Sequence, residues 1–79
     1  MKVPRNLSGR ELGHLLTKNL GYKIIHQRGS HVVLETEDPS RHRIAIPDHK
    51  ALRIGTLNAI VKAVAQHKRI SKEKIIALI

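Results

Sequence analysis

The sequence predicts an α+β fold, in which helices pack on one face of a three-stranded antiparallel sheet. Three observations lead to this prediction. The chain has 79 residues, a length that suits one small domain covering residues 1–79. Apolar residues recur at helical spacing towards both ends, whereas the middle of the chain is rich in strand-forming residues. Short turn-forming segments separate the elements, so neighbouring strands are expected to pair antiparallel.

The first predicted helix runs from Ser8 to Leu20. Ser8 and Glu11 have the S-x-x-E spacing of a capping box, in which each side chain accepts a hydrogen bond from the other residue's backbone amide. Gly21 follows at the position where a left-handed residue commonly ends a helix. The apolar face of this helix is formed by Leu12, Leu15, Leu16 and Leu20.

Three strands are expected next, over residues 22–27, 30–36 and 41–46. Gly29 can turn the chain between the first two strands, because glycine adopts positive φ readily. Pro39 marks the turn before the third strand. Together these turns predict a meander of three adjacent strands.

Side chains along a strand alternate between the two faces of the sheet. On this basis the helices should cover one face, which carries Val32, Leu34, Ile44 and Ile46. The opposite, open face should then carry His31 and Arg43. The first strand has apolar residues at adjacent positions, Ile24 and Ile25, so alternation leaves its orientation undecided.

Two further helices complete the predicted fold. One covers Arg53 to His67, where apolar residues recur at helical spacing from Leu57 to Ala65. The other lies within residues 70–79, with Ser71 as its N-cap. The predicted order of elements is therefore α-β-β-β-α-α.

Composition restricts the function classes. The chain has no cysteine, which excludes disulfides, thiol chemistry and cysteine zinc sites. No apolar run approaches the roughly 18 residues of a membrane span, and the N-terminus lacks the apolar core of a secretory signal. We therefore expect a cytoplasmic protein with no membrane partner.

Charge is the strongest global signal. Fifteen Lys and Arg oppose six Asp and Glu, which gives a formal net charge of +9. The basic residues are dispersed along the chain, so they predict a folded cationic surface that binds a polyanion such as nucleic acid. Tyr22 is the one aromatic residue, and a base-stacking platform of the RRM or OB type needs several.

Three short motifs follow one another: G-S-H at residues 29–31, P-x-H at 47–49 and G-T-L at 55–57. With the segments around them, "GYKIIHQRGSHVVLE", "IAIPDH", "IGTLNAIVKAV" and "ISKEKIIALI", they resemble HicA-type toxins. These toxins are the small RNA-cleaving partners of HicB antitoxins. The resemblance covers nearly the whole chain, although the basic stretch 66–69 looks longer than the family pattern.

The resemblance implies a double-stranded-RNA-binding-domain-like fold. It also implies an mRNA endoribonuclease whose important histidine lies in the G-S-H motif, here His31, and a HicB-like antitoxin that covers this region. Gly29 and Ser30 would support His31: the glycine would let the RNA backbone approach closely, and the serine would donate a hydrogen bond to a phosphate.

A histidine suits this chemistry because RNA carries its own nucleophile, the 2′-OH. Imidazole titrates near pH 6.5, so the neutral form can remove a proton and the charged form can donate one or stabilise the phosphorane. This route needs no metal ion and no small-molecule cofactor. The candidates for binding RNA phosphates are Arg28, Arg43, Lys50 and Arg53.

Several interpretations stay open. His31 can be a strand-edge histidine without function. His49 and Thr56 can fix a loop and a helix start, or they can line the RNA surface; as a helix cap, Thr56 would leave backbone amides free for a phosphate. The histidines lack the spacing of a metal site, so no metal is expected.

The alternative to a ribonuclease is a non-catalytic small basic module that binds RNA by shape. It shares the predicted fold and charge with the ribonuclease. A DNA-binding regulator is disfavoured, because no helix-turn-helix spacing is present.

Overall fold

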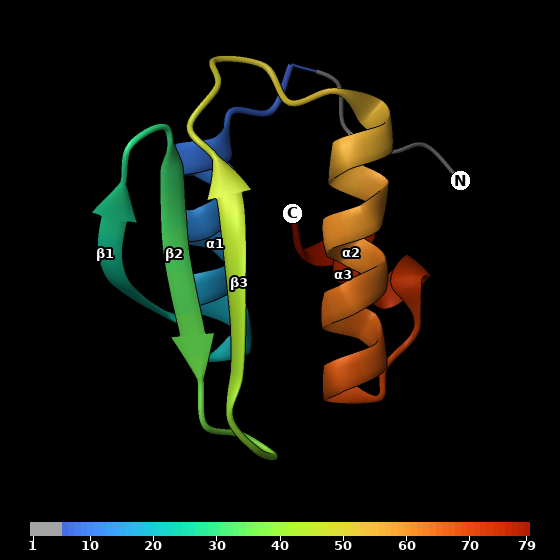
Figure 1. The fold of residues 1–79 in the computed structure, drawn as a ribbon. Helices are drawn as coiled ribbons and strands as arrows, with labels where there is room; N and C mark the ends of the chain where they lie inside the picture. Colours follow the sequence, from blue (N-terminus) through green and yellow to red (C-terminus); the bar gives the residue numbers. More distant parts are fainter. Residues whose placement is uncertain (1–5) are drawn as a thin grey trace.

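The computed structural model describes residues 6–79 and has the predicted order of elements (Figure 1). The elements are α1 (Gly9–Leu20), β1 (Lys23–Arg28), β2 (His31–Thr36), β3 (His42–Pro47), α2 (Ile54–Lys68) and α3 (Lys72–Leu78). Their bounds differ from the predicted ones by a residue or two, the usual uncertainty at element ends. The expectation about a secretory signal falls partly on residues 1–5, outside the described residues.

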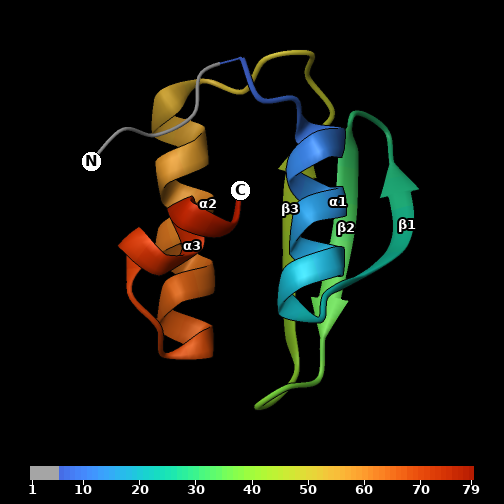
Figure 2. The same cartoon turned by 180° about the vertical axis from the view of Figure 1, so that it is seen from behind.

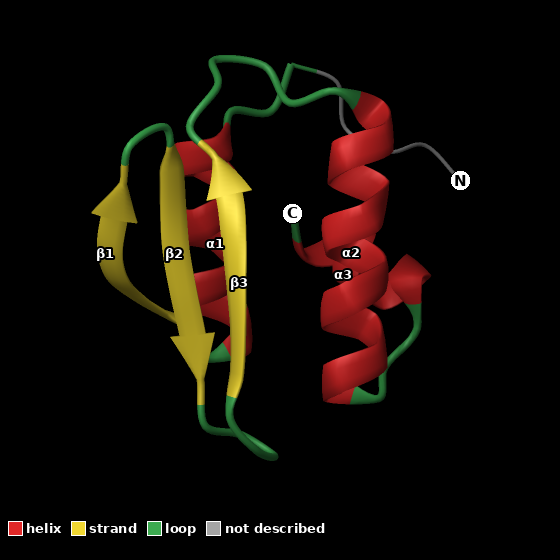
Figure 3. Cartoon of the chain, viewed as in Figure 1, coloured by secondary structure: helices red, strands yellow, loops and turns green. Residues whose placement is uncertain are grey.

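The strands form one antiparallel sheet in the order β1-β2-β3. Figure 3 shows this sheet as one layer, with the helices behind it and to its side. Seen from behind, α1 lies along the sheet in front of β2 and β3, while α2 and α3 pack on each other beside β3 (Figure 2). The predicted α+β class and the open three-stranded sheet are confirmed. Within residues 6–79, no helix is long and apolar enough to cross a bilayer.

The N-terminus of α1 is capped as predicted. The Glu11 amide donates to Ser8 Oγ and the Ser8 amide donates to Glu11 Oε1, both at 3.0 Å. The hydrogen bond from the Ser8 backbone amide holds the pKa of the Glu11 carboxyl below its usual value. Gly21 ends the helix with φ of 74°. At the start of α1, a Cβ on Gly9 would lie 1.9 Å from the Pro47 carbonyl oxygen. Only glycine therefore lets α1 begin against the end of β3.

The starts of α2 and α3 differ. Ser71 caps α3 as predicted, because its side chain accepts a hydrogen bond from the Lys74 amide. The suggestion that Thr56 caps the second helix is wrong. Arg53 holds the extended N-cap conformation, with φ of −65° and ψ of 144°, and makes no side-chain cap bond. Thr56 therefore lies inside the first turn of α2.

The predicted faces of β2 and β3 are confirmed. Val32 pairs with Ile46, and Leu34 pairs with Ile44. Val32, Leu34 and Ile46 are buried in the core, and the partly buried Ile44 packs against it. Burying these aliphatic side chains supplies most of the stability of the sheet. The helices complete the core with Leu12, Leu16, Leu57, Ile60, Val61, Val64 and Ile75.

A β-bulge at Ile25 fixes the orientation of β1. Ile24 pairs with Leu34, but the next paired residue is His26, which pairs with Val33. Cross-strand partners share a face, so Ile24 lies on the helix side with Leu34. His26 lies on the open face with Val33. The bulge thus turns the second half of β1 relative to simple alternation.

Candidate functional site

The predicted G-S-H motif forms a tight turn followed by the first residue of β2. Gly29 and Ser30 are the turn residues, and Arg28 and His31 are the pair that closes it. Gly29 has φ of 60° and Ser30 does not have positive φ, the pattern of a type II′ turn with glycine at its first central position. The backbone conformation alone therefore explains Gly29.

His31 lies exposed on the open face, between Arg28 of β1 and Pro47 of β3. The residues around it line a shallow depression, which we call the open-face depression. It contains His26, Gln27, Arg28, His31, Val33, Arg43, Ile44 and Ala45. The structure thus brings together three predicted site residues, His31, Arg28 and Arg43, and adds His26.

Arg43 reaches the open-face depression, but its charge is already partnered. Its Nη2 and Nε lie 2.8 Å and 3.0 Å from Glu35 Oε2, and Arg41 approaches the same oxygen at 3.4 Å. The hydrogen bonds from Arg43, followed by the charges of both arginines, hold the pKa of Glu35 below its usual value. Arg28 has no ion pair among residues 6–79, so it is the free cation beside His31 in this part of the chain.

The remaining predicted residues lie outside the depression, on the connection from β3 to α2 or, in the case of Thr56, in the first turn of α2. His49, Lys50 and Arg53 are exposed there, at the same end of the sheet as the β1–β2 turn (Figure 1). The His49 backbone carbonyl accepts a hydrogen bond from the Gly9 amide at 3.0 Å. His49 therefore has a structural role through its backbone, while its ring stays exposed.

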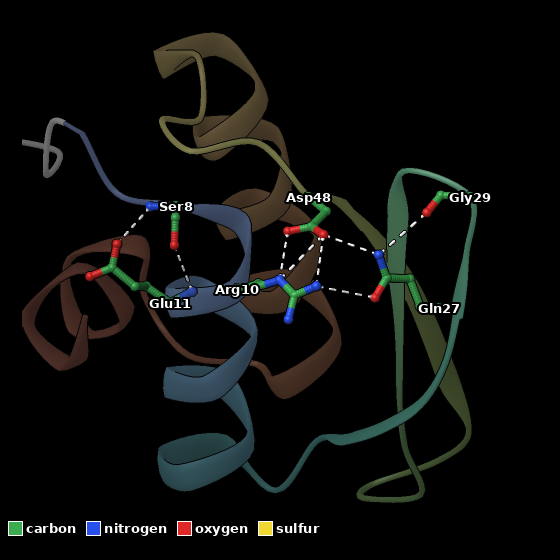
Figure 4. Close-up of polar contacts among 6 residues, drawn as sticks. All are labelled: Ser8, Arg10, Glu11, Gln27, Gly29 and Asp48. Carbon is green, nitrogen blue, oxygen red and sulfur yellow. Dashed lines mark hydrogen bonds and ion pairs between the residues drawn. The ribbon is translucent and has the colours of Figure 1, made fainter.

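A polar group behind the turn was not anticipated from the sequence. It consists of Arg10, Gln27 and Asp48, and we call it the Asp48 network (Figure 4). Arg10 Nε and Nη2 lie 3.0 Å and 3.2 Å from the Asp48 carboxylate, and Gln27 Nε2 donates to it at 3.0 Å. The hydrogen bonds from Arg10 hold the pKa of Asp48 below its usual value.

The Asp48 network holds the turn that precedes His31. The Asp48 amide donates to the Ser30 carbonyl at 2.7 Å, and Gln27 Nε2 also donates to the Gly29 carbonyl at 3.3 Å. Both turn carbonyls are therefore tied to groups that α1 positions through Arg10. Asp48 was visible in the sequence only as the middle residue of P-x-H.

The arrangement offers cationic groups for a phosphodiester and two exposed imidazoles for proton transfer. In the described part of the chain, no group of three or more His, Cys, Asp or Glu is placed to hold a metal ion. The open-face depression presents histidine and arginine side chains.

Comparison with known proteins gives one match. The model of the family described as HicA toxin of bacterial toxin-antitoxin matches residues 9–65. These residues include α1, the whole sheet and most of α2, and with them the open-face depression and the Asp48 network. No curated protein and no solved structure matches the chain.

Proposed function

Because the chain belongs to the HicA toxin family of bacterial toxin–antitoxin systems, we propose that it is an endoribonuclease that cleaves mRNA with His31. The observation that carries this proposal is the exposure of His31 in a cationic depression on the open face of the sheet. A HicB-like antitoxin would neutralise the toxin by covering this face.

In the proposed reaction a phosphodiester lies in the open-face depression against Arg28. Neutral His31 takes the proton of the 2′-OH, and the 2′-oxygen attacks phosphorus. The P–O5′ bond breaks and O5′ takes up a proton from an acid or from water, which leaves a 2′,3′-cyclic phosphate and a 5′-hydroxyl. The Arg28 guanidinium stabilises the charge that develops on the non-bridging oxygens. In this proposal Gly29 would leave room for the RNA backbone, and Ser30 would donate a hydrogen bond to a phosphate.

The decisive test is cleavage of RNA by pure protein in EDTA, before and after His31→Ala. We expect the change to lower the rate by about 10²–10⁴-fold, the usual contribution of one acid–base group, with an unchanged circular dichroism spectrum. The matched control is His14→Ala, which removes an exposed imidazole of α1 and should leave the rate unchanged. Tight binding of intact RNA without His31-dependent cleavage would support the binding module instead.

A modified substrate tests the nucleophile. An RNA with a single 2′-deoxynucleotide on the 5′ side of the cut site lacks the attacking oxygen, so it should resist cleavage there. Cleavage at other sites of the same RNA serves as the internal control. Efficient cutting at the deoxynucleotide would mean that an activated water attacks phosphorus.

The proposed antitoxin contact is tested by charge reversal. An acidic HicB-like protein, sought in the neighbouring reading frame, should lose affinity when Arg28→Glu places a like charge on the open face. Lys62→Glu makes the same change on an exposed position of α2 and should bind as the wild type does. Equal losses from both variants would mean that the partner responds to net charge rather than to this face.

A further inference from the structure

The β-bulge at Ile25 brings a second histidine to the open face. His26 pairs with Val33 while His31 pairs with Arg28, so the histidines are diagonal neighbours across β1 and β2. Diagonal neighbours on one face of an antiparallel pair lie about 7–8 Å apart. Both histidines are exposed and both line the open-face depression.

Cleavage of RNA by its own 2′-OH requires two proton transfers. One proton leaves the attacking 2′-oxygen, and another must reach the departing 5′-oxygen. These oxygens lie roughly in line on opposite sides of phosphorus, so one imidazole cannot serve both in the same step. Two imidazoles on diagonal neighbours of one face, whose backbones lie about 7–8 Å apart, can flank the phosphorus.

We propose that His26 is a second catalytic residue, which donates a proton to the leaving 5′-oxygen. This inference rests on the proposed ribonuclease function. As His31 accepts the 2′-OH proton and the O2′–P bond forms, imidazolium His26 protonates O5′ and the P–O5′ bond breaks. The step ends with His31 protonated and His26 neutral, and proton exchange with water restores both rings.

The surroundings of His26 fit this role. Two cations line the depression beside His26. Arg28 follows two residues later on β1. Arg43 lies on β3 and is ion-paired with Glu35 of β2. Within residues 6–79, the rings of His26 and His31 have no hydrogen-bond partner, whereas those of His42 and His67 do. The His26 proton is therefore not committed to another group of the described chain.

The test uses a leaving group that needs no proton. An RNA substrate with sulfur in place of the bridging 5′-oxygen should make the general acid unnecessary, because a thiolate departs without a proton. The need for His31 as the base should remain. We expect the His26→Ala substitution to slow cleavage of ordinary RNA by about 10²-fold. The same variant should cleave the sulfur-containing RNA at the wild-type rate. His31→Ala should be slow on both substrates.

The pH dependence gives a second readout. A base and an acid acting together give a bell-shaped pH–rate profile, and His26→Ala should remove the fall on the alkaline side. His26→Gln, which keeps a polar side chain on β1, serves if the alanine variant does not fold. Two results would overturn the role of His26 and leave the ribonuclease proposal intact. One is cleavage of ordinary RNA that depends on His31 but not on His26, and the other is a His26→Ala variant that stays slow on the sulfur-containing RNA. Absence of any cleavage by wild-type protein would overturn the ribonuclease proposal as well.

Discussion

A pair of histidines lies at each end of the sheet, and the two pairs have different surroundings. At the end near the β2–β3 turn, His42 Nδ1 lies 3.0 Å from the Tyr22 hydroxyl, and the His42 ring stacks on His67 with 4.3 Å between centroids. His67 Nε2 also lies 2.9 Å from a carbonyl oxygen of that turn. At the other end, His26 and His31 are exposed on the open face. The same residue type thus joins elements at one end and is exposed to solvent at the other.

Burial explains why the first pair is structural. Tyr22 is buried in the core, and burial raises the pKa of its hydroxyl to about 12. A buried hydroxyl needs a hydrogen-bond partner, and His42 provides one. Lys68 of α2 adds a cation 5.2 Å from the Tyr22 ring centroid and donates to Thr36 at 3.0 Å. These contacts attach α2 to the turn end of the sheet.

The largest expected effect comes from removing the partner of Tyr22. His42→Ala leaves the buried hydroxyl unpaired, so the free energy of unfolding should fall by about 1–3 kcal/mol. His31→Ala, an exposed change, should stay within about 0.5 kcal/mol of the wild type. Urea unfolding measures both, and the folded His42→Ala protein should cleave RNA at the normal rate.

A double variant checks the cause of this loss. Adding Tyr22→Phe to His42→Ala removes both partners, so the combined cost should be smaller than the sum of the single costs. Additive costs would mean that the stacking on His67, rather than the hydroxyl, accounts for the effect. Equal stabilities of His42→Ala and His31→Ala would contradict the contrast between the two ends.

The next largest effect concerns positioning of His31 by the Asp48 network. Asp48→Asn keeps the backbone bond to Ser30 but removes the charge that holds Arg10, so the turn should lose order. We expect the single-turnover rate to fall about tenfold, or about 1.4 kcal/mol, with RNA affinity unchanged. Stability should change little, because Arg10 is largely exposed and solvent screens the ion pair.

Glu73→Gln is the control for Asp48→Asn, since it makes the same chemical change at an exposed position of α3. It should leave rate and affinity as they are. If Asp48→Asn lowers RNA affinity and spares the rate at saturation, the network contributes to RNA binding and not to the placement of His31.

Local signals in the sequence predicted the fold well. The capping residues Ser8 and Ser71 act on amides within one turn of helix, so their role is visible in a few neighbouring letters. Alternation assigned Val32 and Leu34 to the core, because every side chain of a regular strand follows the same rule. His31 on the open face follows from the same alternation.

The site depends on contacts that local signals cannot reveal. The Asp48 network joins α1, β1 and the segment after β3, and no spacing in the sequence relates these three segments. The bulge at Ile25 breaks the alternation that would have placed His26. The start of the second helix was predicted close to Arg53, but the interpretation of Thr56 as its cap was wrong, because this helix start has no side-chain cap to recognise. The pairing of Arg43 with Glu35 likewise required the strand register.

A smaller effect is expected from releasing the paired arginines of the open face. Glu35→Gln removes the carboxylate that holds Arg43 and Arg41, so both guanidinium groups become available to phosphate. RNA binding, measured with His31→Ala to prevent cleavage, should tighten several-fold, and each new phosphate contact should steepen the salt dependence by about 0.7. Glu37→Gln in the β2–β3 turn is the charge-matched control. Equal tightening by both variants would mean that net charge alone is responsible.

The smallest effect separates the two pairs by pH. Burial, with smaller contributions from the charges of His67 and Lys68, lowers the pKa of His42 below its ordinary value of 6.5. The unfolded chain therefore binds this proton more strongly than the folded protein does, so the stabilisation is complete above about pH 6.5 and is lost as the pH falls towards the folded pKa. Between pH 7.5 and 5 the carboxylates stay largely ionised, and the urea midpoint should decline with acidity. This decline should be weaker in His42→Ala and unaltered in His31→Ala; an identical decline in all three proteins would place the titrating group elsewhere.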